Sequence, residues 1–172
     1  MSAAPSKLHA LFDLARAGNF PSVASNVLVA LVLSDSIECA IPMAGTAARI
    51  PTTYYSWQAF GLMVLAACLV YAGGATFNDV FDAGFDAKHR PARAIPSGVI
   101  SRTTAGIVAS VEMLLGLGLL IHLGTSPLWG GILAACILGY DWLHKRWIGS
   151  IVLMAGCRVS LACAIASEPW HT

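Results

Sequence analysis

The sequence predicts an all-α fold, a multi-pass transmembrane bundle of about five helices. Hydrophobic residues make up 57% of the 172-residue chain and charged residues only 11%, whereas a soluble domain carries about 25% charged residues. The apolar residues also gather in runs close to the roughly 20 residues that a helix needs to cross a bilayer. Backbone polar groups in lipid must bond within their own segment, so such runs are expected to be helical.

Five runs are expected to span the membrane, and the first is the weakest because Asn26, Asp35 and Glu38 interrupt it. The third and fifth runs hold Glu112 and Arg158 near their middles. A charge at that depth costs about 3 kcal/mol, so both side chains are expected to face protein, either paired with each other or lining a cavity. The runs are residues 21–42, 54–76, 103–123, 127–143 and 148–166.

The distribution of lysine and arginine predicts a cytoplasmic N-terminus and the inner membrane as location. Positive residues collect on the cytoplasmic side of membrane proteins. With the N-terminus inside, only Arg49 lies outside and Arg158 lies within a span. Residues 1–20 lack the apolar core of a signal peptide, so we expect a cytoplasmic segment 1–20, a bundle 21–167 and a tail 168–172. The inside residues are Lys7, Arg16, Lys88, Arg90, Arg93, Arg102, Lys145 and Arg146.

The segment that points to chemistry is Asn-Asp-Val-Phe-Asp-Ala-Gly-Phe-Asp, residues 78–86, where the second span reaches the cytoplasmic side. If the helix continues, Asn78, Asp79, Asp82 and Asp86 fall within one arc of about 100°. Carboxylates so close repel one another unless a cation is present. Mg²⁺ takes one or two carboxylates and completes its shell with water and phosphate. The motif therefore predicts the protein half of a magnesium–diphosphate site.

Basic residues follow the acidic motif directly and would neutralise phosphate oxygens. Acidic groups followed by basic ones suit a diphosphate better than a bare cation. The alternative is a solvated loop that is acidic and then basic, since cytoplasmic location alone would explain the positive charges. The basic residues are Lys88, Arg90, Arg93 and Arg102.

Three segments resemble the UbiA prenyltransferase superfamily, and the resemblance covers residues 20–167. Residues 78–86 are similar to its N-D-x-x-D-x-x-x-D motif, and residues 93–101 to its R-P-I/L-P-S-G-x-I-S segment, with Ala94 in place of the usual proline. Residues 140–145, Tyr-Asp-Trp-Leu-His-Lys, resemble the Y-D-x-x-H-K element of EboC-like members. The spacing between the first two segments is most like that of the chlorophyll-synthase branch.

The resemblance implies a helical bundle of about nine spans around a cavity, with Mg²⁺ as cofactor. It also implies a prenyl diphosphate donor and an apolar, often aromatic, acceptor. Asn78 and Asp82 would then be magnesium ligands, with Asp86 a further candidate ligand and Asp79 supporting the ion or its waters. The candidate substrate-binding residues are Arg90, Arg93 and Lys145 for the diphosphate, together with Tyr140 and, in the first span, Asn26.

The chain departs from the family's pattern in one respect. The second aspartate-rich motif, which the family carries in its later helices, is absent from this sequence. We therefore expect an N-terminal half that is inactive alone and that needs a second-half polypeptide or self-association. The alternative is a non-catalytic membrane protein of the same fold that binds an isoprenoid or a partner chain. The D-G-x-x-A-R opening of CDP-alcohol phosphotransferases is absent too, which argues against that class.

Overall fold

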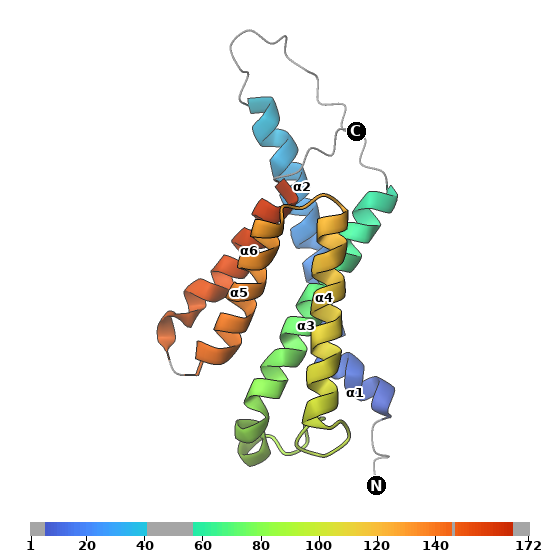
Figure 1. Ribbon diagram of the computed structural model, residues 1–172, viewed down its shortest axis with the longest axis vertical. Helices are drawn as coiled ribbons and strands as arrows, with labels where there is room; N and C mark the ends of the chain where they lie inside the picture. The colour runs from blue at the N-terminus through green and yellow to red at the C-terminus, as the bar shows by residue number, and fades with distance from the viewer. Residues whose placement is uncertain (1–5, 41–56, 146, 167–172) are drawn as a thin grey trace.

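A computed structural model describes residues 6–40, 57–145 and 147–166, which form helices joined by short connections, without any strand (Figure 1). This confirms the predicted all-α class. Arg49, Arg146 and the tail 168–172 lie outside the described residues. The elements are α1 (Lys7–Leu14), η1 (Ala17–Asn19), α2 (Phe20–Ala40), α3 (Trp57–His89), α4 (Arg102–His122), α5 (Pro127–Leu143), η2 (Ile148–Ser150) and α6 (Ile151–Ala166).

The predicted membrane runs correspond to helices of the structure. Within the described residues, the helical stretches Trp57–His89, Arg102–His122 and Ile148–Ala166 are long and apolar enough to cross a bilayer. Ala17–Leu33 and Pro127–Leu143 are apolar but shorter. The prediction of a multi-pass helical bundle is confirmed.

Local sequence signals fix several helix ends. Ser101 precedes α4, and its hydroxyl accepts a hydrogen bond from the backbone N–H of Thr104 at 3.0 Å, which satisfies one of the unpaired donors of the first turn. Pro127 begins α5, where a missing N–H costs nothing. Helix α3 ends at His89, two residues before Pro91. The helix ends there because the residue before a proline is disfavoured in the helical region.

The antiparallel helices α3 and α4 pack closely because glycines face their shared surface. A Cβ at Gly116 would lie 2.7 Å from the backbone nitrogen of Val70 and 2.8 Å from the carbonyl oxygen of Ala66. A Cβ at Gly73 would lie 2.8 Å from the carbonyl oxygen of Ala109. Small residues at such positions let helix backbones approach, as membrane helix pairs require.

Two apolar cores hold the chain together. The larger core joins all the long helices and includes Val27, Met63, Leu120, Leu133 and Ile165. The smaller core lies at the end of the bundle where α3 finishes, and it packs α1 against the α3–α4 connection and the start of α4. Its buried members are Ala10, Leu14, Ile100 and Ala105. The smaller core therefore places α1, which the sequence analysis did not predict, beside the acidic motif.

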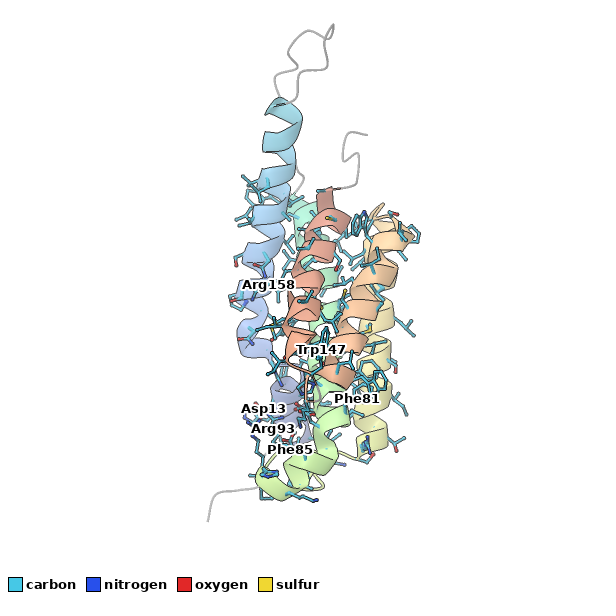
Figure 2. The ribbon with its side chains drawn as sticks, turned by 90° about the vertical axis from the view of Figure 1, so that its left-hand side faces the viewer. Asp13, Phe81, Phe85, Arg93, Trp147 and Arg158 are labelled. Atoms are coloured by element: carbon cyan, nitrogen blue, oxygen red, sulfur yellow. The ribbon has the colours of Figure 1, made fainter. Side chains whose placement is uncertain are left out.

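The two charges in the middle of the predicted spans do not pair with each other. Glu112 is half-buried beside residues of α1, α2 and α3, near Thr76, so it faces protein as expected. Arg158 is exposed on α6 (Figure 2). No ion pair joins the two residues in the described part of the chain, so the predicted pairing is wrong. Arg158 does not face the helices described here, contrary to expectation.

Candidate active site

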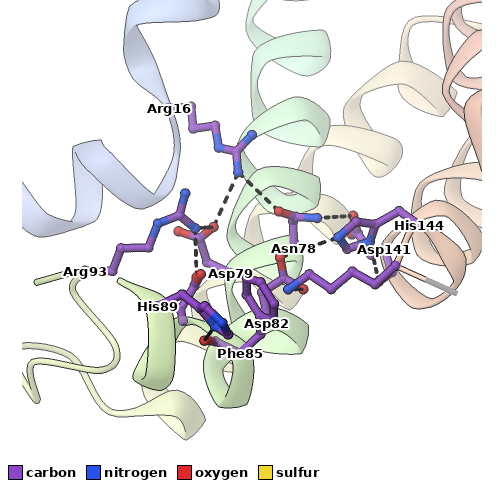
Figure 3. Close-up of polar contacts among 11 residues, drawn as sticks. Arg16, Asn78, Asp79, Asp82, Phe85, His89, Arg93, Asp141 and His144 are labelled. Atoms are coloured by element: carbon purple, nitrogen blue, oxygen red, sulfur yellow. Dashed lines mark hydrogen bonds and ion pairs between the residues drawn. The ribbon is translucent and has the colours of Figure 1, made fainter. Parts of the chain in front are cut away.

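Helix α3 continues without a break through the acidic motif to His89. The condition for a one-sided cluster is therefore met, and the motif side chains share one face of the helix (Figure 3). Asp86 is 1% exposed and Asp79 is 9% exposed, while Asn78 and Asp82 are half-buried. The four polar groups point to neighbouring elements of this chain.

The helical geometry divides this face into two edges. At about 100° per residue the order around the arc is Asn78, Asp82, Asp86 and Asp79. Asn78 and Asp82 contact the end of α5 and the residues just after it, and we call this pair the α5 edge. Asp79 and Asp86 contact the α3–α4 connection, and we call this pair the loop edge.

Arg93 holds the loop edge together. Its Nη1 atom lies 2.8 Å from Oδ1 of Asp79 and 2.9 Å from Oδ2 of Asp86. A buried carboxylate needs such a partner, because an unpaired buried charge is strongly destabilising. Arg93 was expected to contact diphosphate, but in the structure it bonds to these two carboxylates.

Arg16, at the corner between α1 and α2, reaches both edges. Its Nη2 atom donates to Oδ1 of Asn78 at 3.2 Å and to Oδ1 of Asp79 at 3.4 Å. Its backbone has φ 49°, in the left-handed region, which costs about 1–2 kcal/mol for a non-glycine residue. The sequence analysis did not single out Arg16 as a site residue, since its position depends on the unpredicted helix α1.

The α5 edge receives its cations from the segment after α5. The Nζ atom of Lys145 lies 2.7 Å from Oδ1 of Asp82, and Nε2 of His144 lies 3.5 Å from Oδ2 of the same carboxylate. Lys145 also lies 3.7 Å from the centre of the Phe85 ring, a cation–π contact that supports its position. Tyr140 stacks on the His144 ring, with ring centres 5.3 Å apart.

Asp141 is a second residue that the sequence analysis did not assign to the site. It is 5% exposed in the last turn of α5, and its Oδ1 atom accepts a hydrogen bond from Nδ2 of Asn78 at 3.2 Å. Its Oδ2 atom is buried without a partner among the described residues. The available signal was its place beside Tyr140 in the segment that resembles Y-D-x-x-H-K.

A cavity of about 480 Å³ opens between α1, the motif and the α3–α4 connection. Three arginines line it, and a positive cavity wall favours an anionic ligand. Arg90 is exposed, and no ion pair joins it to another described residue. Asn26 is exposed on α2 and takes no part in these contacts. The lining residues are Ala10, Asp13, Leu14, Arg16, Asp79, Arg90, Ala92, Arg93, Ala94 and Ser97.

A comparison with known protein families shows which family the chain belongs to. Residues 39–167 match the UbiA prenyltransferase family. The chain belongs to this family. The resemblance drawn from the three sequence segments is thus confirmed, together with the helical membrane fold that it implied.

The chain is similar in sequence to two curated enzymes. The chain is 32% identical over 118 residues to a digeranylgeranylglyceryl phosphate synthase of Sulfolobus acidocaldarius, covering 69% of this chain and 42% of the relative. It is 32% identical over 138 residues to a 4-hydroxybenzoate octaprenyltransferase of Pectobacterium carotovorum, covering 75% and 45%. The chain therefore spans less than half the length of these UbiA-family relatives.

A solved structure supports the same fold. This structure, described as a digeranylgeranylglyceryl phosphate synthase in membranes, superposes with a TM-score of 0.75 and 19% sequence identity. The superposition covers 92% of this chain and 52% of the other. Nearly the whole described chain thus corresponds to about half of a UbiA-type bundle.

The oxygen atoms at the site suit the magnesium expected for a UbiA-family chain, but in the structure the carboxylates are already paired with Arg93 and Lys145. Asn78 and Asp82 carry amide and carboxylate oxygens at the α5 edge, beside the carboxylate of Asp141, and Mg²⁺ prefers ligands of these kinds. In the structure the amide oxygen of Asn78 accepts from Arg16, and its nitrogen donates to Asp141. Yet the described residues contain no group of three or more His, Cys, Asp or Glu side chains placed to hold a metal. Arg93 and Lys145 instead pair with the carboxylates, so a metal at Asp82 would compete with the lysine.

Proposed function

We propose that this chain supplies the diphosphate-binding part of an intramembrane prenyltransferase. The enzyme would transfer a prenyl group from a prenyl diphosphate to an apolar or aromatic acceptor with Mg²⁺. The observation that carries the proposal is the gathering of four motif side chains and the cations Arg16, Arg90, Arg93 and Lys145 at one end of α3, in a chain of this family.

The two edges of the motif would have different tasks. Asn78 and Asp82 would hold the magnesium ion, which supplies charge neutralisation at the departing diphosphate. Asp86 was a candidate ligand too, but it is 1% exposed and bonded to Arg93. We assign Asp86 and Asp79 to holding Arg93 and, through it, the α3–α4 connection.

The cations would bind the diphosphate oxygens directly. Arg90 is exposed at the cavity, and Arg16 reaches the same cavity while bonding to the motif. Lys145 neutralises Asp82 in the absence of a ligand. If a metal ion took the place of Lys145 at Asp82, the lysine ammonium group would stay within reach of the metal site. It would then donate to a phosphate oxygen, which is a strong charge-assisted hydrogen bond.

The proposed orientation puts this site on the cytoplasmic face of the inner membrane. Helix α1 lies at the same end of the bundle as the end of α3 and the α3–α4 connection (Figure 1). That end carries Lys7, Lys88, Arg90, Arg93 and Arg102, as expected for a cytoplasmic surface.

Turnover would need more protein than this chain. A prenyl cation must be shielded from water until the acceptor attacks, and the chain covers less than half of its curated relatives. We propose that a second-half polypeptide, or another copy of this chain, completes the cavity.

The test is transfer activity in liposomes. The purified chain is reconstituted with Mg²⁺, a labelled prenyl diphosphate and a panel of aromatic acceptors, alone and with a co-expressed second-half polypeptide. Product formed only with the second polypeptide, and lost in Asp82→Ala but not in Gly84→Ala, supports the proposal. The control is matched because a Cβ at Gly84 meets nothing within 4 Å. Product from the chain alone would overturn the need for a second-half polypeptide.

A second candidate function follows from the complete pairing of the motif carboxylates with Arg16, Arg93 and Lys145. A non-catalytic chain of the same fold would keep these pairs and bind an isoprenoid or a partner chain. Isoprenoid binding that is indifferent to Mg²⁺ and to Asp82→Ala would favour this function over the enzyme.

A further inference from the structure

We propose that Asp141 is a positioning residue that fixes the side-chain amide of Asn78 with its oxygen turned towards Arg16, which lines the cavity. The inference rests on the proposed function, in which Asn78 is a magnesium ligand, and adds a residue from α5 to that site. No part of the sequence motif around Asn78 specifies this contact.

The amide of Asn78 lies between two groups of opposite hydrogen-bonding character. Its Nδ2 atom donates to Oδ1 of Asp141 at 3.2 Å, and its Oδ1 atom accepts from Nη2 of Arg16 at 3.2 Å (Figure 3). A guanidinium can only donate, so Arg16 requires the amide oxygen on its own side, and the NH₂ group is then left to donate to the Asp141 carboxyl oxygen. Both neighbours therefore select the same one of the two possible amide orientations.

The orientation matters because the two ends of an asparagine amide are almost equal in size. Packing alone does not distinguish them, and only the bonding partners do. Turned the other way, Asn78 would present an NH₂ group, which has no oxygen lone pair to offer a cation. Outer partners of this kind orient metal ligands and tune their affinity.

Asp141 is itself well held for this task. It is 5% exposed, and Nδ1 of His144 lies 3.0 Å from its backbone oxygen. Helix α5 packs closely on α3, since a Cβ at Gly74 would lie 2.8 Å from Cγ2 of Ile137. The carboxylate of Asp141 is therefore kept at a constant distance from the α3 face that carries Asn78.

The second oxygen of Asp141 independently indicates that the residue faces a ligand. Oδ2 is buried and has no hydrogen-bond partner among the described residues. Buried polar atoms of native proteins are nearly always bonded, so an atom left without a partner here calls for a donor from a bound group. A buried water is such a donor.

The experiment measures Mn²⁺ binding to the full chain in lipid nanodiscs by electron paramagnetic resonance, with a non-reactive prenyl thiodiphosphate present. The variants are Asp141→Ala, Asp141→Asn, Asn78→Ala and the double variant of Asn78→Ala with Asp141→Ala. Asparagine at 141 keeps an oxygen that can accept from Asn78 but loses the charge, which separates orientation from charge.

We expect Asp141→Ala to weaken Mn²⁺ binding about 10–100-fold and Asp141→Asn to retain most of the affinity. In the double variant, the Asp141 substitution should add nothing to the loss caused by Asn78→Ala, because Asp141 acts through Asn78. Unchanged affinity in Asp141→Ala, or a further loss in the double variant, would overturn the inference.

A nuclear magnetic resonance spectrum of the Asn78 side-chain NH₂ group, without any metal, tests the positioning separately. We expect its proton shifts and slow exchange to depend on Asp141 and to survive in Asp141→Asn. If the unsubstituted chain binds no Mn²⁺, the proposed function fails while this spectrum still decides whether Asp141 orients Asn78. An NH₂ signal indifferent to Asp141→Ala would contradict the positioning.

Discussion

The two edges of the acidic motif are built in different ways. At the loop edge, Asp79, Asp86 and Arg93 lie within fifteen consecutive residues, since the bonded pairs are 14 and 7 positions apart. At the α5 edge, Asn78 contacts residues 62 and 63 positions away, Arg16 and Asp141. The Arg93 pairs of the loop edge can form from α3 and its connection alone, with Arg16 added at Asp79 from the α1–α2 corner. The α5 edge exists only when the bundle has assembled. We infer that the first edge is structural and the second is the adaptable, ligand-binding edge.

The largest effect is expected from breaking the loop edge. Arg93→Ala leaves Asp86, which is 1% exposed, without its cation. Removing one partner of a buried ion pair costs about 3–5 kcal/mol, so we expect a loss of this size in the free energy of unfolding. The measurement is a denaturant titration in detergent micelles. Arg90→Ala, three residues away and exposed, serves as the control and should change stability by less than about 0.5 kcal/mol.

An intermediate effect is expected from the helix pair that supports both edges. Gly116→Ala places a methyl group against the backbone of α3, and overpacking of this kind costs about 1–3 kcal/mol. Gly118→Ala, on the same helix, meets nothing within 4 Å and should leave the unfolding midpoint unchanged or slightly raised. Equal midpoints for the two variants would contradict the close α3–α4 packing.

The smallest effect on stability is expected at the α5 edge. The Lys145 side chain is 35% exposed where it pairs with Asp82, and partly exposed pairs contribute about 1 kcal/mol or less. Lys145→Gln should therefore change stability little. It should nevertheless strengthen Mn²⁺ binding, because the competing cation is gone, and weaken diphosphate binding. A loss of stability as large as that of Arg93→Ala would remove the distinction between the edges.

Much of the fold could be predicted because apolar runs and the acidic motif are local signals. The runs located α2 to α6, and the assumption that α3 continues through the motif gave the correct face for Asn78 and Asp82. Helix α1 has eight residues, and so short a helix depends on tertiary packing, here of Ala10 and Leu14 on the start of α4. Its position, and that of Arg16 after it, could not be predicted from local pattern.

The remaining differences also come from contacts between distant segments. Asp141 follows Tyr140 in the sequence, but only the packing of α5 on α3 brings it to Asn78. The pairing of Glu112 with Arg158 was inferred from the cost of a charge in lipid. That cost predicts that each side chain needs a polar partner or water, but it does not predict which partner. In the structure Glu112 lies beside Thr76 of α3 instead.

The central claim is that the α5 edge binds a prenyl diphosphate through a divalent cation. It is tested most directly by titrating a labelled prenyl thiodiphosphate into the chain in nanodiscs, with and without Mg²⁺. The comparison uses the unsubstituted protein, Asp82→Asn and the control Gly84→Ala. We predict magnesium-dependent binding that Asp82→Asn weakens at least tenfold, about 1.4 kcal/mol, and that Gly84→Ala preserves. Binding of equal strength without Mg²⁺, or in Asp82→Asn, would contradict the account.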